Sequence, residues 1–201
     1  MIYYIADNHF GHKNVIRFDN RPFADTVLMD EVLVHNWNER VTEDDTVYIL
    51  GDCFWKNEEN SVKLIQRLKG HKHLIRGNHD RVHGRLRFYY ESIEHYAEIN
   101  DNDRLVILCH YPIPFYKNQH YGAVMLYGHV HNTREQDFIE KWKRELWESE
   151  IPCNMINVGC MMEYMKYTPR TLDEILAANP APEFRKIRSR KEMTQNDILD
   201  R

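Results

Sequence analysis

Apolar, strand-like stretches of this chain repeatedly end in short polar turns, and this arrangement restricts the fold more than any other feature. Five stretches end in this way, and the residues that follow them are Asp7 and His9, Asp52, Asn78 and His79, His110, and His129 and His131. Two predicted helices, residues 26–41 and 61–69, separate the first three stretches. Alternation of strands and helices predicts a mixed or parallel sheet with helices packed outside it. Ligands of such sheets bind beyond the carboxyl ends of the strands, so we expect these polar residues to meet there.

Length and composition favour a single domain. The chain has 201 residues, enough for one domain with a sizeable core or at most two small ones. We expect one domain over residues 1–179, followed by a charged tail, 180–201, that is helical or disordered. The net charge of -4 argues against a broad nucleic-acid-binding face, and only the tail offers a local basic cluster.

The cellular setting predicted from the sequence is the cytoplasm. No apolar run approaches the roughly 18 residues of a membrane span. The first residues have the pattern of a strand and lack the basic region and cleavage site of a signal peptide. The four cysteines form no CxxC pair and are typical of reduced thiols.

The polar residues at the strand ends are suited to metal binding. Carboxylates, amides and imidazoles bind divalent metals, whereas the absence of cysteine among them disfavours a structural zinc site. Asp7 and His9 alone are more simply interpreted as part of a polar loop, but five such strand ends are an improbable coincidence. The candidate ligands number seven, more than one tetrahedral ion needs: Asp7, His9, Asp52, Asn78, His110, His129 and His131. They suit two ions about 3.5–4 Å apart that share a carboxylate and a hydroxide.

In chain order, the same residues form five short motifs. They are Asp7-Asn8-His9, Gly51-Asp52, Gly77-Asn78-His79-Asp80, His110 and Gly128-His129-Val130-His131. This series resembles the signature of the calcineurin-like metallophosphoesterases, and residues 8–16 are similar to a small bacterial and phage subgroup. The resemblance covers roughly residues 1–176. It implies an α/β fold in which two mixed β-sheets form a sandwich flanked by helices, in four layers α/β/β/α.

The resemblance also implies a role for each motif. The first ion would be bound by Asp7, His9 and His131, the second by Asn78, His110 and His129, and Asp52 would bridge the two. His79 would protonate the leaving oxygen or stabilise the transition state, oriented by the Asp80 carboxylate. Manganese is the first expectation for the two divalent ions, and iron, zinc, nickel and cobalt also suit mixed oxygen and imidazole ligation.

Phosphate ester chemistry supports this interpretation independently. The hydrolysis of an anionic ester needs positive charge near the phosphoryl oxygens, which two divalent ions supply. Such ions also lower the pKa of bound water, so that a bridging hydroxide can attack. Histidine has a pKa suited to protonating the leaving oxygen. We therefore predict a metal-dependent phosphohydrolase that acts on a small phosphomonoester or phosphodiester.

Two alternative functions belong to other classes. A protein-binding scaffold that retained the fold would typically have lost a ligand or His79, and this chain has lost neither. A nuclease would need a nucleic-acid-binding region, which only the tail could provide.

Other segments have less definite predictions. His12, Asn14 and Arg17 could reach substrate oxygens or could serve loop packing. Residues 134–148 have an amphipathic pattern that places Phe138 and Trp142 on one apolar stripe with Leu146. This helix could be a lid, an oligomer contact or an excursion from the domain.

Overall fold

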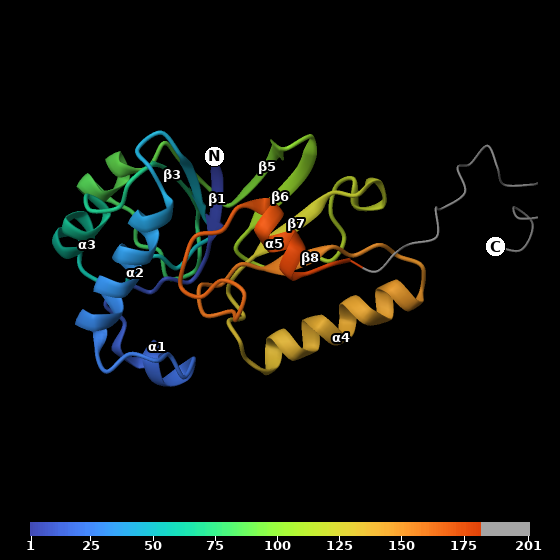
Figure 1. Cartoon of the computed structure of the whole chain (residues 1–201), viewed down its shortest axis with the longest axis horizontal. Coiled ribbons are helices and arrows are strands. Elements are labelled where there is room, and N and C mark those ends of the chain that lie inside the picture. The colour runs from blue at the N-terminus through green and yellow to red at the C-terminus, as the bar shows by residue number, and fades with distance from the viewer. Residues whose placement is uncertain (182–201) are drawn as a thin grey trace, which may run out of the picture.

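Two four-stranded sheets form the centre of the molecule in a computed structural model that describes residues 1–181 (Figure 1). The first sheet has the order β1 (Ile2–Ile5), β2 (Thr46–Ile49), β3 (His71–Ile75), β4 (Ser92–Glu94), and all of its strands are parallel. The second has the order β5 (Tyr96–Asp101), β6 (Arg104–Cys109), β7 (Val124–Tyr127), β8 (Met155–Asn157). Only β5 and β6 are antiparallel within it. The predicted two-sheet α/β fold is thus confirmed, with the first sheet purely parallel. The tail expected from residue 180 lies outside the described residues from position 182 onward.

Helices cover the outer faces of the two sheets. The α-helices are α1 (Lys13–Phe18), α2 (Thr26–Arg40), α3 (Glu58–Ile65), α4 (Arg134–Glu148) and α5 (Leu172–Ala178), and two short 3-10 helices are η1 (Gly84–Tyr89) and η2 (Gln119–Tyr121). In Figure 1, α2 and α3 lie beside the first sheet, and α4 lies along the opposite side of the molecule, against the second sheet. The layers therefore follow the expected order α/β/β/α.

Successive side chains of a strand point to opposite faces of its sheet, and in the second sheet both faces are buried. Val106 and Leu108 of β6 point into the large core that the two sheets share. Ile107, between them, points to the other face and packs in a separate cluster with α4. Tyr4 of β1 also links the sheets, because its hydroxyl donates to Asp101 Oδ2 of β5 at 2.8 Å. A strand buried on both faces has a continuous apolar sequence, as residues 105–109 do.

The helix predicted for residues 134–148 forms with those bounds, and Trp142 and Leu146 of the predicted stripe pack toward the second sheet, but Phe138 does not. Phe138 is 64% exposed, whereas Ile139, Lys143 and Leu146 are buried. Lys143 is tolerated in this contact line because its aliphatic stem packs while its Nζ reaches Glu140 Oε1 at 2.9 Å. Since Ile139 and Leu146 of α4 pack in one cluster with strands of the second sheet, the helix is a layer of the fold, and the interpretation as a lid was wrong.

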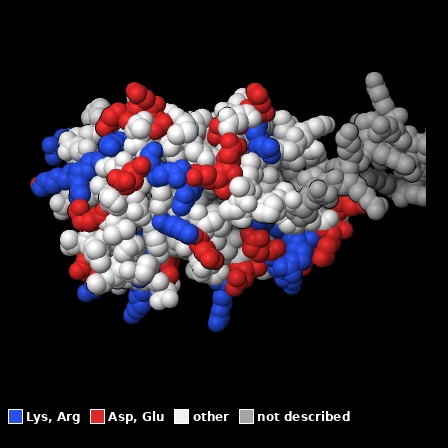
Figure 2. All heavy atoms as spheres, in the orientation of Figure 1, with Lys and Arg blue, Asp and Glu red and all other residues white. Residues whose placement is uncertain are grey.

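Three further features of residues 1–181 are the character of the helices, the state of the cysteines and the distribution of surface charge. None of the helices within residues 1–181 has the length and apolar character needed to cross a membrane. All four cysteines are buried free thiols. On the face shown in Figure 2, lysine and arginine side chains are interspersed with aspartate and glutamate over the described part of the chain.

Candidate metal centre

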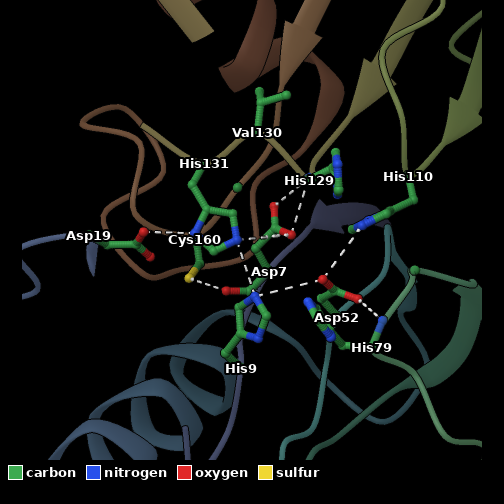
Figure 3. A network of polar contacts seen from close by, with 12 residues as sticks. Asp7, His9, Asp19, Asp52, His79, His110, His129, Val130, His131 and Cys160 are labelled. Atoms are coloured by element: carbon green, nitrogen blue, oxygen red, sulfur yellow. Dashed lines mark hydrogen bonds and ion pairs between the residues drawn. The ribbon is translucent and has the colours of Figure 1, made fainter. Parts of the chain in front are cut away.

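The carboxyl ends of strands from both sheets meet at one edge of the molecule. The sheets join there, because the Ala6 N–H donates to the Val158 carbonyl and the Cys160 N–H donates to the Ala6 carbonyl, each at 2.8 Å. The residues that follow β1, β2, β3, β6 and β7 are thereby brought together, and they are Asp7, His9, Asp52, Asn78, His79, His110, His129 and His131. Figure 3 shows side chains of this set directed toward a common centre.

Asp7, His9 and His131 form a first group of ligand atoms that lie within 4.8 Å of one another. The Nε2 atoms of His9 and His131 are 3.1 Å apart. His131 Nε2 also lies 3.7 Å from Asp7 Oδ1. Both Asp7 and His9 are almost completely buried, so that little water can compensate their polar atoms.

Asn78, His110 and His129 form a second group around one amide oxygen. Asn78 Oδ1 lies 3.1 Å from His110 Nε2 and 3.0 Å from His129 Nδ1. Asp52 lies between the two groups, since its Oδ2 is 3.6 Å from His110 Nε2 and 3.8 Å from His9 Nε2. Asp7, Asp52 and His110 also satisfy the distance requirement for a shared ion.

The hydrogen-bond partners of His110 show that this site suits cations. His110 Nδ1 must carry a hydrogen, because it donates to the Leu50 carbonyl at 2.8 Å. Its Nε2 in the neutral ring is therefore a lone pair, and it faces the oxygens of Asn78 and Asp52. Acceptors that face acceptors leave buried polar groups unsatisfied, which is costly unless a cation lies between them. The donor set fits divalent metal ions.

The pKa shifts of Asp7 and His9 agree with this arrangement. Burial raises the pKa of Asp7 to about 6, although nearby His131 and His110 oppose the rise. Burial, followed by the proximity of His131, lowers the pKa of His9 well below its usual value and keeps that ring neutral. A neutral imidazole is the form that binds metal. A buried carboxylate with a raised pKa is stabilised in its ionised form when a cation binds.

Asp19 orients His131 from outside the ligand set. Its Oδ1 accepts from His131 Nδ1 at 2.7 Å, which leaves Nε2 free to face Asp7 and His9. Burial alone would lower the pKa of His131, but the hydrogen bond and charge of Asp19 raise it. A carboxylate behind a histidine is a common way to fix the ring and strengthen it as a ligand.

Five of the seven candidate ligands have a strained backbone. The φ angles are 56° for Asp7, 51° for His9, 53° for Asp52, 71° for His129 and 51° for His131. This left-handed region costs a non-glycine residue about 1–2 kcal/mol. Such strain is retained where surrounding contacts impose it, and it concentrates at functional sites.

Arg21 imposes part of that conformation on the first motif. Its guanidinium is buried and donates to the carbonyls of Asp7 and Asn8, each at 2.9 Å. Asp19 pairs with the same guanidinium at 2.8 Å. The backbone of His9 is held from the other side, where its N–H donates to the Asp52 carbonyl at 2.9 Å.

Two motif glycines permit the close approach of ligand side chains. A Cβ at Gly77 would lie 2.3 Å from Asp52 Oδ1, and a Cβ at Gly128 would lie 2.6 Å from Asp7 Oδ2. Neither contact is sterically allowed, so any side chain here would displace a candidate ligand.

Asp80 has a different role from the predicted one. Its Oδ2 accepts from the N–H groups of Asp52 and Gly77 at 2.8 Å, and its Oδ1 accepts from the Cys53 N–H at 2.9 Å. The carboxylate therefore binds the turn after β2 to the turn after β3, and the expectation that it orients the His79 ring was wrong. The geometry makes Asp80 a positioning residue for Asp52.

His79 lies beside the ligands with an exposed side chain. Its N–H donates to Asp52 Oδ1 at 2.9 Å, which fixes its backbone relative to the centre. Its ring makes an edge contact with Trp55, with centroids 4.7 Å apart. Trp55 in turn stacks on His12, with centroids 4.0 Å apart and an interplanar angle of 14°. His12 is thus close to the site and contacts Trp55.

Asn14 and Arg17 are exposed on α1. Within residues 1–181, neither makes a side-chain hydrogen bond or ion pair with a candidate ligand, and the Arg17 guanidinium lies 5.3 Å from the centre of the Phe18 ring. Their contact with substrate stays a prediction.

Known proteins resemble this chain over most of its length. The uncharacterized protein MJ1445 of Methanocaldococcus jannaschii is 32% identical over 179 residues, which is 87% of this chain and 89% of that protein. The chain belongs to the MJ1445 family. The gene 66 protein of Mycobacterium phage L5 is 38% identical over 85 residues, 40% of each chain. No family model matches the chain.

A solved structure shows the same fold. The protein of unknown function AQ665 from Aquifex aeolicus superposes with a TM-score of 0.68 at 25% identity, covering 89% of this chain and 98% of that one.

Three residues of the site were not predicted from the sequence. Asp19 and Arg21 lie in a loop after α1, and nothing in the local pattern separates their ion pair from an ordinary surface pair. Trp55 offered a weak signal, since a large aromatic residue follows Asp52 by three positions.

Removal of metal ions is expected to lower stability substantially. Asp7 and Asp52 are 0% and 2% exposed, so ions held by these candidate ligands would bind the folded state with a geometry that the unfolded chain lacks. Ions at about 1,000 times their Kd would add about 4 kcal/mol, or about 10 °C in Tm. Thermal unfolding of protein dialysed against chelator, with and without added Mn²⁺, measures this shift. His35→Gln, at an exposed histidine of α2, should retain the shift, and its persistence in Asp52→Asn would contradict the assignment.

Proposed function

We propose that the protein is a dinuclear metal-dependent phosphohydrolase that cleaves a small phosphomonoester or phosphodiester. The observation that carries this proposal is that the two groups of candidate ligand atoms lie on opposite sides of the Asp52 carboxylate. The ordered motifs that resemble the calcineurin-like metallophosphoesterases support the same reaction class.

Bound divalent ions would supply positive charge for the phosphoryl oxygens and acidify the attacking water. In the overall reaction, water oxygen bonds to phosphorus as the bond to the leaving oxygen breaks, and the water releases a proton to solvent. His79 gives its proton to the leaving oxygen and regains one from solvent. The exposed ring of His79 suits this role, because it borders the ligands without facing into either group.

The chain's other residues maintain the geometry of this centre. Asp52 offers one carboxylate to both groups, and Asp80 holds its backbone in place. Asp19 and Arg21 hold the first group through His131 and the carbonyl of Asp7. The net charge of -4 favours a small substrate over a nucleic acid polymer. Manganese as the ion and the cytoplasm as the compartment remain predictions.

Metal analysis combined with a substrate panel tests the proposal. Protein purified without chelator should contain about two divalent ions per chain, and it should hydrolyse p-nitrophenyl phosphate or bis-p-nitrophenyl phosphate when Mn²⁺ is added. Cobalt, nickel, zinc and iron are compared in parallel, and single-stranded DNA is included as a substrate. Protein that binds no ions and hydrolyses nothing would favour the scaffold, and cleavage of DNA alone would favour a nuclease.

A further inference from the structure

A pocket of about 210 Å³ adjoins the candidate metal centre on the side of His79. Asn78 and His79 line it, and they also border the ligand groups. If His79 protonates the leaving oxygen, the rest of the leaving group must extend past its ring, away from the ligands. The pocket lies on that path.

One wall of this otherwise polar pocket is apolar and aromatic. Phe54 and Leu86 are buried beneath it, and Val82 is half-buried at its side. Trp55 also lines it, 45% exposed, and is held by stacking on His12. A ring held in this way loses little conformational freedom when a ligand binds, and it favours contact with a second aromatic ring.

The pocket has two cationic residues, and they differ in their partners. Lys56 Nζ is paired with Asp30 Oδ2 at 3.2 Å, so its charge is largely compensated. Arg81 is exposed and makes no ion pair with any carboxylate in residues 1–181. An uncompensated guanidinium beside the aromatic wall of the pocket favours an anionic group on the ligand.

We propose that this pocket binds the leaving group of the phosphoester, and that it selects a planar aromatic leaving group that bears a negative charge. This inference rests on the proposed function. Trp55 contacts the ring, and Arg81 binds the anionic substituent. The volume accommodates a group of one or two rings and is below the range of about 300 Å³ and more that is typical of pockets for larger ligands.

Two esters that differ only in charge test this selectivity. The 3-carboxyphenyl and 3-carbamoylphenyl phosphates have leaving phenols of similar acidity and nearly the same shape. The wild-type protein should hydrolyse the carboxylate with a kcat/KM about tenfold higher, as one charge-assisted hydrogen bond provides. Arg81→Gln should reduce this ratio to near one. Arg85→Gln, at an exposed arginine outside the pocket, should leave the ratio unchanged.

Binding to metal-free protein gives a second readout that does not depend on turnover. The product 3-hydroxybenzoate should quench tryptophan fluorescence, and Trp55→Phe should remove most of the quenching. Arg81→Gln should weaken the binding by about tenfold.

The outcomes separate this inference from the proposed function. Equal hydrolysis of the two esters, unchanged by Arg81→Gln, would overturn the pocket assignment and leave the phosphohydrolase proposal standing. If neither ester were hydrolysed with any metal, the proposed function would fail and the leaving-group role with it. Quenching that persists fully in Trp55→Phe would also overturn the assignment.

Discussion

Replacing Asp52 with asparagine is expected to reduce phosphoester hydrolysis by about 10³-fold or more. Asp52 lies between both ligand groups, with Oδ2 3.8 Å from His9 Nε2 and 3.6 Å from His110 Nε2. The substitution keeps the shape of the side chain, and the retained oxygen can still accept the His79 N–H. The loss is therefore one of charge, and about 4 kcal/mol of transition-state stabilisation corresponds to three decades in rate.

Two measurements on Asp52→Asn distinguish a metal defect from misfolding. The metal content should fall by at least one ion per chain, and the protein should remain folded by circular dichroism. Asp101→Asn is the matched control, because it makes the same chemical change at a buried carboxylate that binds Tyr4 far along the second sheet. Full activity and full metal content in Asp52→Asn would rule out a bridging role.

Replacing His79 with alanine is expected to slow hydrolysis by about 10²–10⁴-fold for esters whose leaving group is a poor one. Esters of p-nitrophenol leave without protonation, so for these the loss should be below about tenfold. Metal content and Tm should stay unchanged, because the His79 ring is exposed and belongs to neither ligand group.

The dependence on the leaving group is the decisive result for His79. It is measured as kcat/KM for a series of alkyl and aryl phosphates in both proteins. His83→Ala, at an exposed histidine four positions along the chain, should show no such dependence. If kcat/KM fell equally for all leaving groups, His79 would instead bind the substrate or stabilise the charge of the transition state.

Individual strands and helices could be predicted from the sequence because their patterns of apolar residues are local. Residues 104–109 and 134–148 form a strand and a helix with the predicted bounds, since apolar runs and amphipathic periodicity depend on near neighbours. The exposed Phe138 of α4 shows the limit of this reasoning. Phe138 is apolar, but the line of contact with the second sheet passes through Ile139 and Lys143, and only the packing of the two elements determines that line.

The ligand set followed from the sequence for a physical reason. Each candidate ligand directly follows a strand, and strands of α/β sheets deliver the residues at their carboxyl ends to a common edge. The contacts behind the ligands join residues far apart in the chain. His131 and Asp19 are separated by 112 positions, and Cys53 and Asp80 by 27. No local pattern specifies such pairs.

The sequence by itself therefore determined which residues could hold metal ions and on which edge of the sheets they would lie. Only the tertiary structure decided how they are held. It assigned Asp80 to the backbone of Asp52 instead of the His79 ring, and it placed Asp19 and Arg21 behind the first group. It also put Trp55 beside His79. The strained backbone at five ligands depends on these long-range contacts, because an isolated turn would relax from the left-handed conformation that the packed sheets impose.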